Sequence, residues 1–288
     1  MISIMYNKWS KTDIPSNINE AFYAVQELRG KPNPEYDQYY VKLETSYQRV
    51  LLENPLNYDN KRIIFLGDMD LTSLSLGMMS KPKDLAVLDI DKRIPEIVFK
   101  LKFDYKIRSI RFVNHDIRVR MLAILRNQFN YIFLEPPMTK EGLEIGLSRA
   151  VQCATKNTPS KIFLSFDIKK EDEEWIDRMV ETMDLEIENK YLDFNRYEYL
   201  TPQEKNTSSM YILRVKNSSK ETITNHYFGP IYFRESKMSP KPFRCKCGAI
   251  YKIGEKGDFE SLKSLENKTC PICNYAGPFI YDSTVPIE

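Results

Sequence analysis

Short runs of apolar residues recur along the middle of the chain, and polar or acidic residues end each of them. Parallel strands covered by helices on both faces carry such continuous apolar runs, because neither face of the strand meets water. The pattern therefore predicts five buried parallel strands. They span residues 63–66, 85–88, 110–113, 131–134 and 162–166.

The segments between these runs are expected to be helical. Apolar residues in 139–154 recur close to every fourth position, which is typical of a helix with one buried face. Another helix is expected around 44–52. Two later runs, 185–194 and 209–215, favour strands and have little helical sequence between them, so they predict an antiparallel hairpin. The whole pattern predicts an α/β fold, a Rossmann-like sheet of the class I methyltransferase type.

This organisation divides the chain into three expected parts. Residues 1–58 form a short N-terminal lead-in that closes the site, 59–235 the catalytic domain, and 236–288 a small zinc ribbon. No run of 18 apolar residues occurs, so no membrane-spanning helix is expected. The first 19 residues lack the apolar core of a signal peptide, and we expect a cytoplasmic protein.

Opposite charges nearly cancel over the whole chain, with 42 Lys and Arg against 40 Asp and Glu. This balance makes a dedicated nucleic-acid packer or a polybasic membrane binder unlikely. It conceals a local split, since 92–126 holds ten basic residues against three acidic ones, whereas 167–198 holds twelve acidic residues against five basic ones. The two histidines exclude a His-rich metal centre, and the ten glycines include no glycine-rich phosphate loop.

Acidic residues follow four of the predicted strands. In an open α/β sheet, ligands bind outside the carboxyl ends of the strands, so these acids should gather around one crevice. Any one of them could instead cap a helix. They are Asp68 and Asp70 after the first strand, Asp89 and Asp91 after the second, Asp116 after the third and Glu135 after the fourth.

The spacing of these acids favours an adenosyl ligand. Asp89 follows Gly67 by 22 positions, close to the offset at which an acid contacts a ribose hydroxyl in Rossmann folds. Asp116 would lie beside the base. A cluster of carboxylates repels a pyrophosphate but suits a sulfonium or an amine cation.

Two prolines follow the acid at the end of the fourth strand, in the order Glu135-Pro136-Pro137. In nitrogen-directed transferases of this fold, an acid or amide before two prolines holds the attacking amine, and the rigid prolines aim the following carbonyl at it. The alternative interpretation is a simple strand stop.

Taken in order, the motifs over roughly 33–216 resemble the branched-chain polyamine synthases, the N4-bis(aminopropyl)spermidine synthases. The resemblance rests on Glu35-Tyr36-Asp37-Gln38, Glu44-Thr45, Arg49-Val50, Gly67-Asp68-Met69-Asp70-Leu71-Thr72-Ser73, Leu88-Asp89-Ile90-Asp91, His115-Asp116-Ile117-Arg118, Glu135-Pro136-Pro137-Met138-Thr139, Glu141-Gly142-Leu143, Leu147-Ser148-Arg149 and, more weakly, Phe194-Asn195-Arg196-Tyr197.

The resemblance implies transfer of an aminopropyl group from decarboxylated S-adenosylmethionine to an amine of spermidine or a related polyamine, with release of methylthioadenosine. A homodimer is what the family would suggest. The implied catalytic residues are Asp70, Asp68 and Glu135. Those implied to bind the adenosyl co-substrate are Gly67, Asp89, Asp91, Asp116 and Gln38, and Tyr36, Pro136 and Pro137 would contact the acceptor. Met69 and Met138 replace acids of the family pattern, which leaves the acceptor and the branching of the product open.

Two other functions stay open. A methyltransferase that uses intact S-adenosylmethionine on RNA, DNA or protein would suit the basic stretch 92–126, although Asp68 and Asp70 would repel the carboxylate of the methionine. A non-catalytic polyamine- or nucleoside-binding protein would explain Met69 and Met138. Nucleic acid is not expected as the partner.

Four cysteines near the C-terminus stand in two close pairs, Cys245 with Cys247 and Cys270 with Cys273. Such pairs predict a structural Zn²⁺ site, closed by four thiolates and therefore not catalytic; unligated or redox-active thiols are the alternative. Residues 236–288 carry eight basic and six acidic residues, which is too balanced for a nucleic-acid surface.

Overall fold

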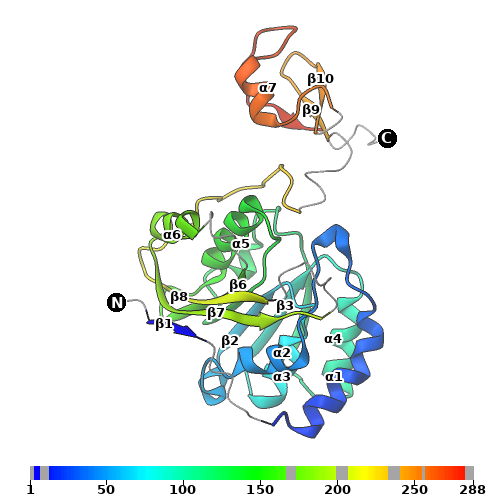
Figure 1. The fold of residues 1–288 in the computed structure, drawn as a ribbon, viewed down its shortest axis with the longest axis vertical. Coiled ribbons are helices and arrows are strands. Elements are labelled where there is room, and N and C mark those ends of the chain that lie inside the picture. Colours follow the sequence, from blue (N-terminus) through cyan, green and yellow to red (C-terminus); the bar gives the residue numbers. More distant parts are fainter. Residues whose placement is uncertain are drawn as a thin grey trace.

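The computed structural model describes residues 3–6, 13–166, 173–198, 207–232, 241–254 and 257–282. An eight-stranded sheet forms the larger part of the chain, and a three-stranded sheet forms a small C-terminal part (Figure 1). The strands are β1 (Ser3–Tyr6), β2 (Arg62–Leu66), β3 (Asp84–Asp89), β4 (Ile110–Asn114), β5 (Tyr131–Leu134), β6 (Ser160–Phe166), β7 (Leu185–Arg196), β8 (Thr207–Val215), β9 (Lys241–Arg244), β10 (Ile250–Ile253) and β11 (Ile280–Tyr281). The α-helices are α1 (Ser16–Arg29), α2 (Leu43–Val50), α3 (Thr72–Met79), α4 (Ile94–Phe103), α5 (Lys140–Cys153), α6 (Glu173–Thr182) and α7 (Leu262–Lys268), and the 3₁₀ turns are η1 (Pro34–Tyr36), η2 (Pro55–Tyr58) and η3 (Ala123–Leu125).

The strand order of the large sheet is β1-β7-β8-β6-β5-β2-β3-β4. Strands β2 to β6 pair in parallel, and β8 pairs antiparallel with both β6 and β7. The predicted five parallel strands and the closing hairpin are therefore confirmed, and with them the Rossmann-like sheet.

Two features differ from the sequence-based expectation. The N-terminal strand β1 pairs in parallel with β7 at the sheet edge, where only a polar lead-in was expected. No α-helix connects β4 to β5; this stretch contains only the short η3. There the carboxylate of Asp116 accepts a hydrogen bond from the backbone N–H of Arg118 at 2.8 Å, which closes a turn. The following chain then buries Met121 and Leu125 without forming a helix.

Each face of the sheet has its own hydrophobic core. Alternate residues of a strand point to opposite faces, so Ile63 and Phe65 pack against α1 to α4, whereas Ile64 and Leu66 pack on the side of α5 and α6 (Figure 1). Across β2, β5 and β6, the rings of Phe65, Phe133 and Phe163 stack with centroids 4.6 and 4.7 Å apart and planes inclined by 10°.

Two arginines attach the N-terminal segment to the sheet. Arg29, at the end of α1, is fully buried; its guanidinium lies 4.0 Å from the centroid of the Tyr40 ring and donates to the carbonyl of Met69 at 3.3 Å. Arg93, at the start of α4, donates to the carbonyls of Arg29 and Lys31 at 2.6 Å each.

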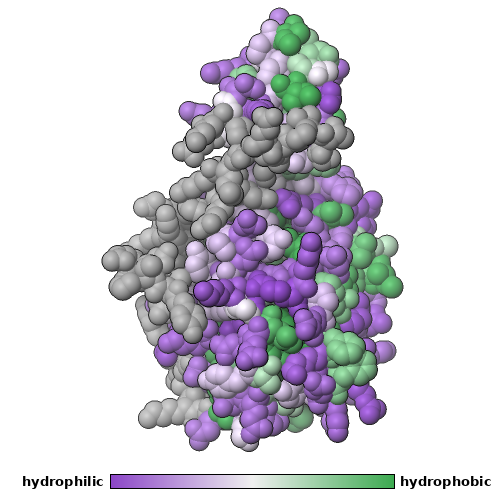
Figure 2. All heavy atoms as spheres, turned by 90° about the vertical axis from the view of Figure 1, so that its right-hand side faces the viewer, coloured by the Kyte–Doolittle hydropathy of each residue, from purple (hydrophilic) through white to green (hydrophobic). Residues whose placement is uncertain are grey.

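The side of the molecule that carries α1 and α4 is mostly hydrophilic, with separate hydrophobic patches (Figure 2). Within the described residues, none of the helices has the length and apolar character needed to cross a membrane.

A third buried arginine holds the segment that follows β8. The guanidinium of Arg149, on α5, donates to the carbonyls of Ile223 at 2.9 Å and Asn225 at 2.7 Å, and also to that of Ile117 at 2.7 Å in the loop after β4. The segment is thereby fixed along α5. Its far end is held by Thr139, at the start of α5, whose hydroxyl donates to the carbonyl of Ile231 at 2.5 Å.

Replacing the central ring of the aromatic stack should strongly destabilise the fold. Phe133 is 5% exposed, so Phe133→Ala leaves a cavity and should lower the free energy of unfolding by about 3–5 kcal/mol. Urea unfolding measures the change. The control is Phe228→Ala, because Phe228 is 56% exposed and its loss should change the free energy by about 0.5 kcal/mol or less. Equal effects of the two substitutions would contradict the assignment of the stack to the core.

Candidate active site and cysteine cluster

The strand order reverses direction between β2 and β5, and a cavity lies at their carboxyl ends. In folds of this kind, the point of reversal is where ligands bind. The side chains of Phe65, Phe133 and Phe163 line the cavity together with the polar residues. Those polar residues are Arg49, Asp68, Asp70, Thr72, Glu135 and Ser165. The structure thus brings together all three residues predicted to be catalytic.

Gly67 allows the chain to turn sharply after β2. Its φ of +83° lies in the left-handed region, and a Cβ there would be 3.6 Å from the backbone oxygen of Glu135. The turn brings Asp68 to the start of α3, where its Oδ1 accepts from the backbone N–H of Ser73 at 3.2 Å. Gly67 is therefore favoured here by its left-handed backbone conformation, since a Cβ would make only an ordinary contact with Glu135.

Asp70 is buried, and both of its carboxylate oxygens are engaged. Oδ1 accepts from the backbone N–H of Val41 at 2.9 Å, and Oδ2 accepts from Nη1 of Arg49 at 2.7 Å. Burial alone would raise the pKa of Asp70, but the charge of Arg49 and the hydrogen bonds lower it below the ordinary value. Asp70 is therefore ionised at neutral pH.

Glu135 faces Asp70 across the same guanidinium. Its Oε2 accepts from Arg49 Nη1 at 3.1 Å, and its Oε1 accepts from the Tyr197 hydroxyl at 2.9 Å. Burial and the neighbouring charge of Asp70 raise the pKa of Glu135 well above its usual range, despite the opposing effect of Arg49. Of the two carboxyls that contact Arg49, Glu135 is therefore the weaker acid.

Asp68 and Asp89 are a second pair of carboxyls with raised pKa values. Burial, opposed mainly by hydrogen bonds from Ser73, raises the pKa of Asp68 to about 8. Burial also raises the pKa of Asp89 to about 6. Asp89 Oδ1 accepts from the backbone N–H of Asp91 at 2.8 Å. Asp68 thus stays largely protonated at neutral pH, and unlike Asp70 it pairs with no arginine among the described residues.

Asp91 and Gln38 lie together, but they are bonded to each other. Gln38 Nε2 donates to Asp91 Oδ2 at 2.8 Å, and Asp91 also accepts from the backbone N–H and the guanidinium of Arg93. These hydrogen bonds outweigh burial and lower the pKa of Asp91 to about 2. The pair joins the N-terminal segment to α4; its predicted contact with an adenosyl ligand remains a prediction.

The remaining predicted residues contact other parts of the fold. The carboxylate of Asp116 is engaged by Arg118, with Oδ2 2.7 Å from Nη2. Tyr36 packs 5.7 Å, centroid to centroid, from Tyr232, in a cluster that also contains Ile90. Pro136 and Pro137 pack on α5 at its glycines, and a Cβ on Gly146 would lie 2.9 Å from that of Pro136, too close for a side chain.

Besides Thr72, four polar residues of the site were not among those predicted from the sequence. Arg49 contacts Asp70 and Glu135, Tyr197 and Ser165 contact Glu135, and Asn195 accepts from Arg49 Nε at 2.8 Å. For three of them the sequence carried a signal, because Arg49, Asn195 and Tyr197 lie in motifs of the resemblance. Ser165 follows an apolar run and had none.

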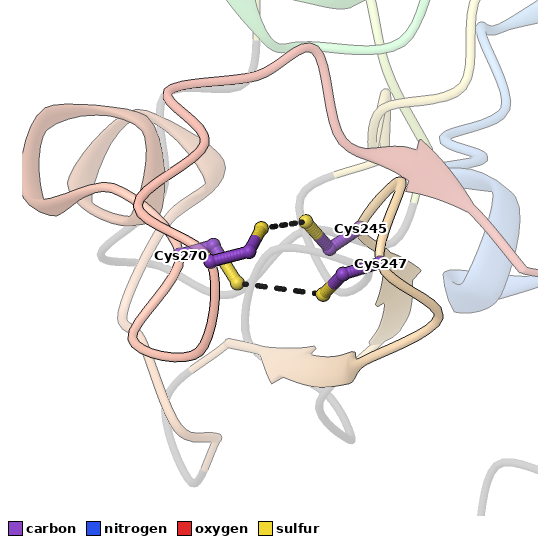
Figure 3. Close-up of side chains that lie close together, drawn as sticks. Cys245, Cys247 and Cys270 are labelled. Carbon is purple, nitrogen blue, oxygen red and sulfur yellow. Dashed lines mark hydrogen bonds between the residues drawn. The ribbon is translucent and has the colours of Figure 1, made fainter.

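The four predicted metal ligands come together in the C-terminal unit, where all four Sγ atoms lie within 4.8 Å of one another. Figure 3 shows Cys245, Cys247 and Cys270 turned toward a common centre. The Sγ atoms of Cys245 and Cys273 are 3.6 Å apart, and those of Cys247 and Cys270 are 3.8 Å apart. Tetrahedral zinc with Zn–S bonds of about 2.3 Å needs sulfurs about 3.8 Å apart, so the cluster fits this ion.

The fold and the site define an α/β protein of the class I methyltransferase type with a carboxylate-lined pocket at the strand reversal. Residues 17–242 match the model of the branched-chain polyamine synthase A C-terminal domain, and the chain belongs to that family.

Known relatives are similar to parts of this chain. An uncharacterised protein of Methanocaldococcus jannaschii is 32% identical over 81% of this chain. The N(4)-bis(aminopropyl)spermidine synthase of Thermococcus kodakarensis is 31% identical over 48% of the chain. The chain spans 58% of the first relative's length and 40% of the second's.

A solved structure confirms the fold. The branched-chain polyamine synthase of Thermus thermophilus, in complex with N4-aminopropylspermidine and 5'-methylthioadenosine, superposes with a TM-score of 0.67 at 20% identity. The match covers 77% of this chain and 70% of the other.

Burial of Asp68 should make stability depend on pH. Between pH 4 and 8 the folded protein holds a proton on Asp68 that the unfolded chain has released, so this side chain destabilises the fold increasingly as pH rises toward its folded pKa of about 8. Asp68→Asn removes the effect. In urea unfolding, its stability relative to the parent protein should be higher at pH 8 than at pH 5 by about 1 kcal/mol or more. Asp177→Asn, at an exposed position of α6, is the control. A relative stability that does not change with pH would refute the buried, protonated state.

Proposed function

We propose that the chain catalyses aminopropyl transfer from decarboxylated S-adenosylmethionine to an amine nitrogen of spermidine or a related polyamine. The nitrogen lone pair attacks the carbon of the aminopropyl group that is bonded to sulfur. The C–S bond breaks, its electron pair returns to sulfur, and neutral 5'-methylthioadenosine leaves. The new C–N bond leaves a positive charge on nitrogen, which is relieved when a proton passes to a carboxylate or to solvent.

The observation that carries this proposal is the meeting of Asp68, Asp70 and Glu135 around one cavity in a chain of this family. The ligands of the Thermus thermophilus enzyme, an aminopropylated polyamine and methylthioadenosine, are those that the proposed reaction would produce. Acidic groups suit a polyamine, because a polycation needs anionic groups to replace its water.

The roles that we assign to the individual residues are those that the family resemblance implies. Asp70 accepts the proton of the acceptor, with Asp68 beside it, and Glu135 orients the attacking nitrogen. Asp89 holds the ribose. The other residues predicted to bind the adenosyl co-substrate are Gly67, Asp91, Asp116 and Gln38. Tyr36, Pro136 and Pro137 form the wall toward the acceptor. The N-terminal segment 1–58 closes the site over the catalytic domain 59–235, as the hydrogen bond from Val41 to Asp70 supports.

Product analysis separates this function from its two rivals. The protein is incubated with decarboxylated or intact S-adenosylmethionine, together with a panel of polyamines or RNA, and the products are followed by mass spectrometry. Methylthioadenosine that rises with added polyamine supports the proposal. Adenosylhomocysteine formed only from the intact donor would establish methyl transfer instead, and binding without either product would establish a non-catalytic protein.

Loss of the carboxylate at position 70 should abolish most of the activity. Asp70→Asn removes the proton acceptor and should lower the rate of methylthioadenosine release by about 10²-fold or more. Asp104→Asn is the control, since Asp104 pairs with Lys100 on the exposed face of α4 and should retain the parent rate. Full turnover by Asp70→Asn would remove Asp70 from the role of base.

For the C-terminal unit, 236–288, we infer that Cys245, Cys247, Cys270 and Cys273 hold a structural Zn²⁺. The four thiolates leave no open position, so zinc supplies stability rather than catalysis. Tyr251 supports the site, because its hydroxyl lies 3.0 Å from Cys270 Sγ and can donate to the thiolate.

Metal analysis tests this assignment. The purified protein should contain about one equivalent of zinc, and Cys270→Ser should lose most of it. Cys153→Ser is the matched control, because Cys153 is buried in α5 and lies outside the cluster. Zinc removal should speed the proteolysis of 241–282 and change the rate of methylthioadenosine release far less. That result would confirm a structural role. Zinc well below one equivalent in the parent protein would exclude it.

A further inference from the structure

The guanidinium of Arg49 occupies the space between the two carboxyls that receive the acceptor nitrogen. Nη1 lies 2.7 Å from Asp70 Oδ2 and 3.1 Å from Glu135 Oε2. The other edge of the guanidinium donates to Asn195 Oδ1 at 2.8 Å and to Ser165 Oγ at 3.1 Å. The side chain is 5% exposed. Arg49 is therefore a fixed part of the site, with hydrogen bonds from all three nitrogens of its guanidinium.

Arg49 sets the charge that an incoming amine meets. Two adjacent carboxyls without a cation would favour a protonated amine, whose positive charge they would balance. Here the charge of Arg49 already pairs with both Asp70 and Glu135 through Nη1. The other titratable groups facing this point are Tyr197, which donates to Glu135, and Asp68, which is buried beside Asp70. Neither adds a negative charge at neutral pH.

We propose that Arg49 is a positioning residue which acts as the resident cation of the acceptor site, so that the site binds the reacting nitrogen as a neutral amine. This inference rests on the proposed function. A polyamine nitrogen is protonated in neutral solution, so it releases one proton to the solvent when it enters the site. Its lone pair is then available for attack on the aminopropyl carbon. The other amines of the polyamine, which do not lie beside Arg49, keep their charge.

Titration calorimetry measures this proton directly. The parent protein, saturated with methylthioadenosine, is titrated with spermidine at pH 7 in buffers of different ionisation enthalpy. The slope of the observed enthalpy against the buffer enthalpy should show about one proton released for each spermidine bound. Binding without proton release would overturn the inference while leaving aminopropyl transfer intact. Absence of methylthioadenosine formation with every amine would instead refute the proposed function.

The pH dependence of turnover tests Arg49 itself. Without the guanidinium, the bound nitrogen should hold its proton to higher pH, because two carboxyls then face it alone. In Arg49→Gln, the acid limb of the kcat profile should move up by about one pH unit or more, which lowers kcat at a pH on that limb about tenfold. Arg49→Lys keeps the charge and should keep the limb near the parent position, even where kcat falls because fewer hydrogen bonds remain.

The position of the limb distinguishes this role from a structural one. A variant that merely folds poorly loses active enzyme, so its profile falls without moving along the pH axis. Arg214→Gln is the matched control, since Arg214 is a half-exposed arginine of β8 paired with Glu186 and should leave the profile unchanged. An acid limb of Arg49→Gln that coincides with that of the parent protein would exclude the proposed role. If this variant does not fold, Arg49→Lys and the proton count of the parent protein still decide the question.

Discussion

The parallel pairing of β2 with β5 is the constraint on which the site depends. These strands are neighbours in space although β3 and β4 separate them in the chain, and the sheet grows away from them in both directions. Their carboxyl ends therefore leave a gap that no connecting helix fills. The turn at Gly67 follows β2, and beyond it Asp70 shares the guanidinium of Arg49 with Glu135. A shift in the register of this pair would separate all three groups.

Burial of the carboxyls gives the site its chemistry at some expense of stability. Ionising a buried carboxyl costs free energy, because the charge loses its water. Neighbouring residues avoid this cost in different ways. Asp70 is charged and paired with Arg49, whereas Asp68 is held largely protonated without a cation. Two carboxyls only two positions apart in the chain thus hold different charges, because one of them faces α2 and the other the start of α3.

The sequence predicted the sheet well because buried strands leave a local apolar pattern, and the acids that end them could be placed at one edge by topology alone. It could not predict partners contributed from distant elements. Arg49 lies on a helix of the N-terminal segment, and nothing local shows that it reaches Ser165, 116 positions away. Asp116 shows a different limit: its partner Arg118 is only two positions away, but the sequence does not show that the two side chains pair.

The anchoring of the segment after β8 limits how far the C-terminal unit can reach. Arg149 and Thr139 hold this segment to α5 up to Ile231, so the connection to β9 begins at Tyr232 rather than at Val215. Eight residues separate Tyr232 from Lys241, and a fully extended chain of that length spans about 30 Å, compared with about 90 Å if the connection began at the end of β8. Together, Arg149 and Thr139 thereby keep the start of the cysteine-containing unit within about 30 Å of Tyr232.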